Sequence, residues 1–351
     1  MNPVLMTRRC VPALCLAFMA LPAAAQTTDQ PAATPADPVA AVPAPAAADG
    51  APATVVVSGR RTGPGVWKVS KGGHVLWVFG TYSPLPVKMQ WDASRVERLV
   101  GRSQEVLRPP VAKAHIGLLS GLTALPGLIG IKKNPGDAVL ADVLPDGVYA
   151  HWTVLKAKYI GADDGIEHYR PLFAGEELLL AGLKKNGLTS GSDVLRKIEK
   201  IAKKNKVKLS DSGIDVTLDD PRKFVHDFKE APVDDVACLA STLDSLDVDL
   251  ETMRVRANAW ANGNIAEIRN LDYGTRQDTC LDAGLGSPVA QDVAGLQQMR
   301  DRLRAAWLKT AEKSLAVNPS TFAVLELRDV VGPTGYLAAL QAKGYVVESP
   351  N

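Results

Sequence analysis

Apolar residues first gather in two short valine-rich stretches, at 54–58 and 66–70, and then in the run 74–79. Lys71-Gly72-Gly73 separates the last two stretches and is typical of a tight turn. A short apolar run bounded by a turn favours a strand. The pattern therefore predicts a β-hairpin whose second strand ends at Gly80.

A change in apolar spacing after the hairpin predicts the first helix. Between 91 and 100, apolar residues three and four positions apart fall on one side of a helix. Asp92 is the expected N-cap, because its carboxylate can accept from backbone N–H groups of the first turn. Residues 104–107 then predict a short strand, which ends before Pro109-Pro110.

The middle of the chain has helical spacing over long stretches. Apolar residues recur every three or four positions from 137 to about 206 and again from 221 to 261. Pro221 suits the first position of a helix, where its missing N–H costs nothing. Residues 289–315 predict one long amphipathic helix.

The C-terminal part returns to strand. Residues 321–327 predict a strand, Gly332-Pro333 breaks the chain, 336–342 predict a short helix, and 345–348 predict a last strand. Strands at both ends of a helical middle predict an α/β or α+β fold. Its central sheet would combine N- and C-terminal strands and carry a large helical insertion.

One apolar segment, 116–131, is rich in leucine and glycine. It is too short for a membrane span, and Pro126 and four glycines disfavour a continuous helix. We expect this segment to be a lid or a buried loop. No other stretch of the mature chain predicts a transmembrane segment.

The N-terminus has the features of a secretory signal peptide. Arg8 and Arg9 precede an apolar stretch, 11–21, that is too short for a stable membrane anchor. Ala23-Ala24-Ala25 fits the small residues required at a cleavage site, so we expect cleavage after Ala25. The protein is therefore expected in the periplasm or outside the cell.

Composition divides the remaining chain into a linker and one domain. Residues 26–53 are mostly Ala, Pro, Thr, Gln and Asp and are expected to be disordered, which leaves 54–351 as a single domain. Without Arg8 and Arg9, the basic residues equal the 38 acidic ones in number. This neutrality argues against nucleic acid as a general partner, because phosphate binding requires a positive surface.

Two of the four cysteines remain after cleavage. Cys10 and Cys15 lie in the signal peptide, whereas Cys238 and Cys280 lie in the domain. Two cysteines in an oxidising compartment are best explained as one disulfide, the alternative being two free thiols. The disulfide would stabilise the fold by roughly 3–4 kcal/mol.

Several motifs, in order, resemble the TraB/GumN (Tiki-like) family. Residues 77–86 resemble its first motif, a hydrophobic strand that ends in Gly-x-x-His, and Glu105 matches the acidic position of the following strand. Trp260-Ala-Asn-Gly263 resembles its Trp-x-x-Gly segment. The region 322–347 resembles its C-terminal motif, through Gly332-Pro333-Thr334-Gly335 and Gly344-Tyr345. The resemblance implies a fold related to the erythromycin-esterase and ChaN-like group, with strand ends meeting at one cleft.

The chain departs from the family pattern at the positions expected to do the chemistry. Ser83 stands where the first motif has His, and in the second motif Glu326 stands for Gly and Asp329 for His. A neutral imidazole binds metals and titrates near neutral pH, and a serine hydroxyl does neither. The candidate catalytic residues are Ser83, Glu105, Glu326 and Asp329, with Arg170 as a candidate substrate-binding residue.

Two functions remain open from the sequence. The candidate carboxylates could hold a divalent cation such as Mg²⁺, Mn²⁺ or Ca²⁺ in a remodelled, peptidase-like hydrolase. Alternatively the catalytic site is degenerate, and the protein is a pseudoenzyme that binds a peptide, a polysaccharide or an envelope protein. Arg170 is either an anion clamp or a residue that starts a helix.

Overall fold

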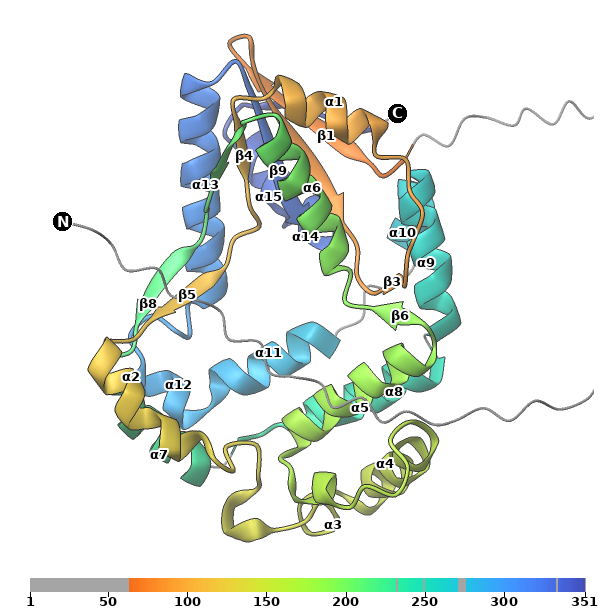
Figure 1. The fold of residues 1–351 in the computed structure, drawn as a ribbon, viewed down its shortest axis with the longest axis vertical. Helices are drawn as coiled ribbons and strands as arrows, with labels where there is room; N and C mark the ends of the chain where they lie inside the picture. Colours follow the sequence, from red (N-terminus) through yellow and green to blue (C-terminus); the bar gives the residue numbers. More distant parts are fainter. Residues whose placement is uncertain (1–62, 232, 249, 271–275, 333, 351) are drawn as a thin grey trace, which may run out of the picture. The chain divides into compact units, whose positions relative to one another are not determined.

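The computed structural model describes residues 63–350, apart from 232, 249, 271–275 and 333 (Figure 1). The expected signal peptide, the linker and the strand at 54–58 lie outside the described residues. Among the helices of the described part, none is both long and apolar enough for a membrane span.

A six-stranded mixed sheet carries the main core, with the strand order β10-β1-β2-β9-β4-β7. Its strands are β1 (Val66–Lys71), β2 (His74–Thr81), β4 (Glu105–Leu107), β7 (Lys208–Ser210), β9 (Ser320–Glu326) and β10 (Val346–Glu348). β2, β9, β4 and β7 are parallel, whereas β1 is antiparallel to β2 and β10. The predicted hairpin and the sheet built from both chain ends are confirmed, and β7 is an additional strand from the helical middle.

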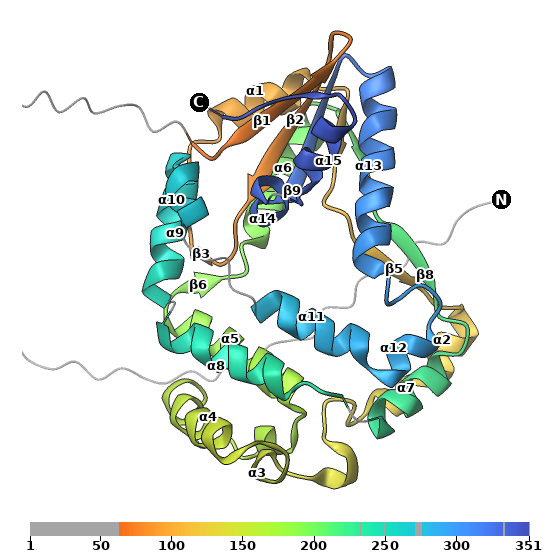
Figure 2. The ribbon, with the colours of Figure 1, turned by 180° about the vertical axis from the view of Figure 1, so that it is seen from behind.

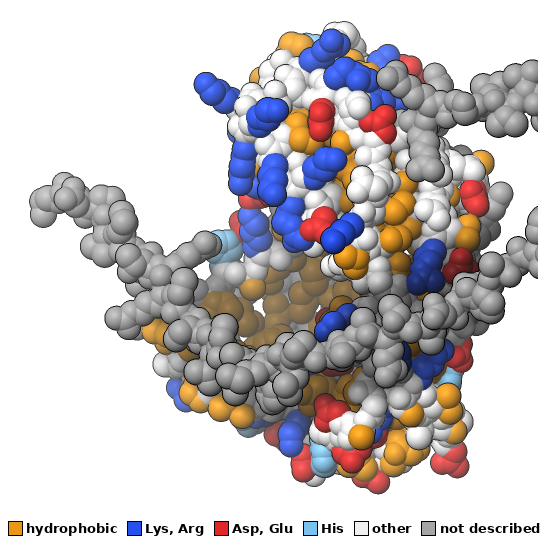
Figure 3. Space-filling view, turned by 45° about the vertical axis from the view of Figure 1, so that its right-hand side comes forward, with side chains coloured by type: hydrophobic (Ala, Val, Ile, Leu, Met, Phe, Trp, Pro, Cys, Tyr) orange, Lys and Arg blue, Asp and Glu red, His pale blue; other side chains and the backbone are white. Residues whose placement is uncertain are grey.

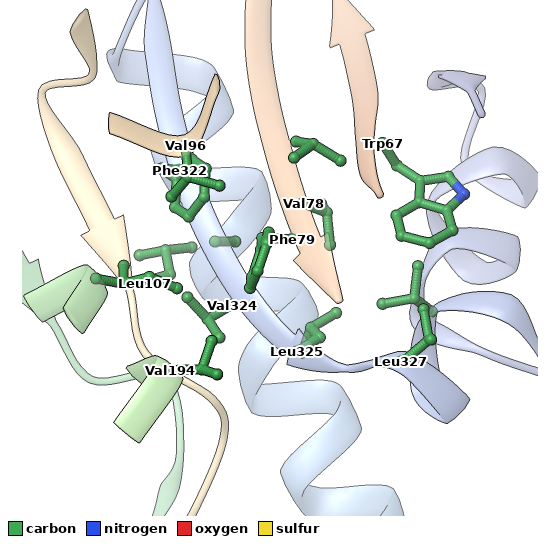
Figure 4. Packing of buried hydrophobic residues seen from close by; sticks show 14 of the residues in the cluster. Trp67, Val78, Phe79, Val96, Leu107, Val194, Phe322, Val324, Leu325 and Leu327 are labelled. Carbon is green, nitrogen blue, oxygen red and sulfur yellow. The ribbon is translucent and has the colours of Figure 1, made fainter. Parts of the chain in front are cut away.

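Helices cover both faces of this sheet (Figures 1 and 2). One face carries α1 (Ser94–Arg102) and α6 (Ser192–Lys204), and the other carries α13 (Met299–Val317), α14 (Leu327–Val331) and α15 (Tyr336–Ala342). The rings of Phe79 and Phe322 stack in this core with centroids 6.2 Å apart (Figure 4). Trp260 meets Phe79 edge-on. The central parallel strands β2 and β9 are largely buried and therefore consist of nearly continuous apolar runs rather than alternating ones.

A second hydrophobic cluster holds the helical insertion together. Its helices are α3 (Leu140–Val143), α4 (Asp146–Tyr159), α5 (Pro171–Lys185) and α8 (Val236–Val248). Trp152, Leu178 and Leu243 are fully buried in this cluster. The remaining helices are α7 (Pro221–Glu230), α9 (Leu250–Asn262), α10 (Ile265–Asn270), α11 (Arg276–Gly286) and α12 (Pro288–Asp292).

Short elements connect these parts. Two two-stranded sheets pair β3 (Leu85–Pro86) with β6 (Leu188–Thr189) and β5 (Ala112–His115) with β8 (Ile214–Thr217). Three 3₁₀ turns are η1 (Leu125–Leu128), η2 (Pro135–Asp137) and η3 (Gly165–His168).

The basic run in α6 forms a solvated helix face. Val194, Ile198 and Ala202 face the core, while the lysines and arginine between them are exposed. Figure 3 shows Lys and Arg side chains gathered on the upper part of one face of the molecule.

Three local predictions need correction. The predicted long helix over 289–315 is two helices, because the chain turns at Gly295, where φ is +74°. α1 begins at Ser94 rather than beside Asp92, although Asp92 still accepts from the Ser94 N–H at 2.8 Å.

The segment expected to be a lid or a buried loop is instead partly helical. It contains α2 (Leu118–Ala124) and η1, and α2 packs against α7. Leu122, Leu125 and Ile129 are exposed to 57, 54 and 79 %. The segment is therefore a surface element rather than a buried loop.

Candidate functional site

The C-terminal ends of β2 and β9 lie side by side at one edge of the sheet. Their parallel register pairs Thr81 with Glu326, so the residues that follow each strand are neighbours. Gly80 permits this arrangement, because a Cβ there would lie 2.6 Å from the Leu327 side chain. Trp260 donates from Nε1 to the Gly80 carbonyl at 2.8 Å and ties the Trp-x-x-Gly segment to the same edge. In open α/β sheets this edge is the usual place of a ligand site.

Ser83 and Glu326 line one cleft of about 380 Å³ at this edge. The Ser83 side chain is exposed, and its Oγ donates to the backbone carbonyl of Ser190 at 2.8 Å. Among the described residues, neither an imidazole nor a carboxylate bonds to Ser83 Oγ. A serine nucleophile needs such a base to remove its proton.

The Glu326 carboxylate is held by a neighbouring guanidinium. Arg328 Nε lies 3.0 Å from Glu326 Oε2, and Arg328 Nη1 lies 3.5 Å from Asp278 Oδ1. Arg328 also lines all three cavities at this edge. The carboxylate of Glu326 is therefore already paired, and Arg328 is shared between two acidic side chains.

Asp329 lies in α14, beside Glu326, and lines a neighbouring cavity of about 520 Å³. Burial raises the pKa of its carboxyl to about 6, and the charges of Glu326 and Asp278 add to the effect. Arg328 offsets the rise only in part. The structure thus brings three of the four candidates, Ser83, Glu326 and Asp329, to one edge of the sheet.

Glu105 lies at the opposite edge, so the expected convergence of all four side chains is wrong for this residue. It is the first residue of β4 and pairs in register with Thr321, near the start of β9. Ser314 Oγ and Asn318 Nδ2 donate to its Oε2 at 2.8 and 3.0 Å. Lys208 Nζ donates to Oε1 at 2.8 Å, and Ser210 Oγ donates to the same oxygen.

These donors reverse the effect of burial on Glu105. Burial alone would raise the pKa of the carboxyl, but hydrogen bonds from Lys208, Ser210 and Ser314 outweigh it and lower the pKa to about 2. The side chain is ionised and saturated with donors. Its contacts are those of a structural group that joins β4, β7 and α13.

Arg170 starts a helix and has no access to a ligand. It precedes Pro171 at the start of α5, and only 2 % of the residue is exposed. Its guanidinium donates to the carbonyls of Phe228 and Lys229 at 2.7 and 2.8 Å, and to that of Ala231 at 3.0 Å. These carbonyls end α7, so Arg170 caps the C-terminus of that helix.

The predicted disulfide is confirmed. Cys238 and Cys280 are bonded, with Cα atoms 4.5 Å apart. The bond joins α8 to α11 and so fixes α11 against the helical cluster.

Three arginines at the sheet edge are functional candidates that the sequence analysis missed. Arg256 in α9, Arg276 in α11 and Arg328 in α14 line one cavity of about 240 Å³. They come from segments far apart in the chain, and no spacing pattern connects them. Only Arg328, two residues after Glu326, lies close enough to a motif to have been noticed.

The donor set at this edge does not fit a divalent cation. In the part of the chain that the structure describes, no group of three or more His, Cys, Asp and Glu is placed to hold a metal. Glu326 is paired with Arg328, burial favours protonation of Asp329, and the arginines repel a cation.

The chain belongs to the TraB/PrgY/gumN family, whose model matches residues 65–349. The match spans the whole described domain, including both strand ends that form the candidate site. Searches of curated proteins and of solved structures found no significant match to this chain.

Proposed function

We propose that this chain is an exported member of the TraB/PrgY/gumN family that acts by binding at the sheet edge rather than by catalysis. The ligand would be a peptide, a polysaccharide or an envelope protein, bound in the cleft between Ser83 and Arg328. The expected signal peptide supports a site of action in the periplasm or outside the cell.

One observation carries the proposal: the candidate nucleophile at the edge is not bonded to a base. Ser83 donates to the backbone carbonyl of Ser190, and Glu326 is in an ion pair with Arg328. The carboxyl of Asp329, whose pKa burial raises to about 6, would suit a general base, but it is not bonded to Ser83. The cleft lined by Ser83, Glu326 and Arg328 has a volume of about 380 Å³, which is large enough to hold part of a ligand.

The metal-dependent hydrolase weighed from the sequence required several carboxylates around one ion. Of the three candidate carboxylates, the edge holds only Glu326 and Asp329, and Glu105 lies at the far end of the strands. Glu326 is paired with Arg328, as is the neighbouring Asp278. A binding role accounts for the surplus of guanidinium groups, which catalysis through a cation would not.

A thermal-unfolding titration of the mature chain with Mg²⁺, Ca²⁺, Mn²⁺ and Zn²⁺ tests the proposal. An ion bound only by the native state at a hundredfold excess over its dissociation constant adds about 2.7 kcal/mol, which raises the midpoint by a few degrees. We expect no ion to shift the midpoint of the wild-type protein.

The variants Asp329→Ala and Asp146→Ala serve as a matched pair, because Asp146 is exposed on α4 and lines none of the three edge cavities. A shift that Asp329→Ala abolishes and Asp146→Ala keeps would establish a metal centre at the edge. That result would overturn the binding role in favour of the hydrolase.

A further inference from the structure

The cavity shared by Arg256, Arg276 and Arg328 has an unusual charge. Among the described residues that line it, none is Asp or Glu. Side chains of three arginines therefore line a volume of about 240 Å³, and Glu326 and Asp278, the counter-charges of Arg328, lie outside this lining. Like charges this close repel one another, and the cost grows where water is excluded.

Of the three arginines, Arg276 has the positive charge that nearby groups offset least. Its guanidinium makes no hydrogen bond or ion pair with any residue that the structure describes. Burial lowers the pKa of the guanidinium, Glu176 partly offsets this effect, and Arg328 adds to it. Arg276 is partly buried, and a partly desolvated cation without a bonded partner lowers the stability of a fold, so its presence indicates a role other than stability.

The position of Arg276 in its helix adds to the positive potential. It is the first residue of α11, an eleven-residue helix. The backbone N–H groups of a helix N-terminus carry a partial positive charge, which disfavours a cation and favours an anion there. The helix and the three side chains act in the same direction.

Part of the cavity wall is apolar. Leu179 and Leu183 from α5 and Met253 from α9 line it, together with the three arginines. A small inorganic anion would leave this wall unused. A ligand with a charged head and an apolar chain would contact both the arginines and the apolar residues of the cavity.

The cavity opens toward the cleft of the candidate site. Both are lined by Ser83, Gln277 and Arg328, among other shared residues. The side-chain amide of Gln277 can donate a further hydrogen bond to an anion held by Arg328. The charged head of a ligand would thus lie where the two spaces meet.

We propose that this cavity binds an amphiphilic anion, with a carboxylate or phosphate head on Arg276 and Arg328 and an apolar chain against α5 and α9. The inference rests on the proposed binding role and assigns that role a ligand class. Guanidinium groups suit both heads, because each offers paired donors to two oxygens.

Calorimetric titration of the mature protein with decanoate and with decyl phosphate, below their micelle-forming concentrations, tests the inference. Acetate and inorganic phosphate supply the heads without the chain, and decanol supplies the chain without the head. We expect the two amphiphiles to bind, and each isolated part to bind at least about tenfold more weakly. The stronger of the two amphiphiles identifies the head group.

Arg276→Gln and Arg222→Gln form the matched pair of variants. Arg222 is exposed on α7 and lines none of the three edge cavities. Arg276→Gln should weaken amphiphile binding by about tenfold or more while its thermal midpoint stays equal to or above that of the wild type. Arg222→Gln should bind as the wild type does.

Amphiphile binding that is absent, or that Arg276→Gln leaves unchanged, would overturn the arginine pocket. This failure differs from that of the proposed function, which a metal-dependent rise of the midpoint would contradict. A neutral peptide or glycan that binds while both amphiphiles do not would keep the binding role and remove its anionic ligand.

Discussion

The two ends of the parallel strands treat a buried acidic group in opposite ways. At the amino end, Glu105 accepts from four side chains, which hold the pKa of its carboxyl at about 2. At the carboxyl end, burial raises the pKa of Asp329 to about 6, and the nearby Arg276 has no bonded partner among the described residues. Both carboxyl groups lie at ends of the same parallel strands, so the difference between their pKa values comes from the hydrogen-bond donors around each group.

This difference separates stability from function within one sheet. A buried ion with all of its hydrogen bonds made contributes to folding, whereas an incompletely paired one reduces stability. Natural folds keep such costly groups mainly where a ligand is to be bound. In the binding role proposed above, the carboxyl edge is the functional edge, and the contacts of Glu105 make the amino edge a structural joint.

Removing the disulfide should lower the free energy of unfolding more than any of the substitutions below. Cys238 and Cys280 are 42 residues apart, and opening a loop of this size costs about 4 kcal/mol in the chain-entropy model. The double variant Cys238→Ala/Cys280→Ala should lower the urea unfolding free energy by about that amount. It should also weaken amphiphile binding, because α11 carries Arg276. A loss of stability below about 1 kcal/mol would contradict this account of how α11 is held.

Glu105→Gln should have the second-largest effect and lower the free energy of unfolding by about 3 kcal/mol at pH 7, measured by urea unfolding. The amide cannot accept from Lys208, Ser210, Ser314 and Asn318 as the carboxylate does. Glu348→Gln is the control, since Glu348 is half exposed and pairs only with Lys68 among the described residues. The control should change stability by less than about 0.5 kcal/mol.

The pH dependence of the same group has a defined sign. Because the pKa of Glu105 is lower in the folded state, its contribution is complete above its ordinary value of 4.5 and is lost as the pH falls toward 2. Glu105→Gln should remove this part of the acid dependence. An unchanged loss of stability between pH 4.5 and 2 would contradict the structural role of Glu105.

Asp329→Asn should have a smaller effect of the opposite sign. The pKa of Asp329 is raised from 3.8 to about 6, so its ionisation costs stability as the pH rises through this range. The neutral amide should therefore gain on the order of 2 kcal/mol at pH 7 and almost nothing at pH 3.5. Urea unfolding at the two pH values measures both quantities. An equal change at both would show that ionisation is not the cause.

Pattern and motif predicted most of the sheet but not its full extent. The hairpin, β4, β9 and β10 consist of apolar runs bounded by turns, and each was predicted. β7 is Lys208-Leu209-Ser210, which contains one apolar residue and so shows no apolar run, and only its pairing with β4 makes it a strand. The break at Gly295 likewise depends on a local turn that the apolar spacing of 289–315 does not reveal.

The candidate site was predictable only where strand ends carry a motif. Ser83, Glu326 and Asp329 follow two parallel strands, and such ends meet at one edge of a sheet. Glu105 is the first residue of its strand rather than the last. A few residues along a strand decide at which edge of the sheet a side chain lies. The arginines come from three distant helices, so only the tertiary structure brings them together.

The proposed role requires the carboxyl edge of the sheet to bind anions and not divalent cations. Thermal unfolding of the wild-type protein and of Arg276→Gln, each with Mn²⁺ and with decyl phosphate, tests it most directly. We expect decyl phosphate to raise the thermal midpoint of the wild type and to have a much smaller effect on Arg276→Gln, and we expect Mn²⁺ to raise neither midpoint. A rise with Mn²⁺ in the wild type, without a rise with decyl phosphate, would contradict it.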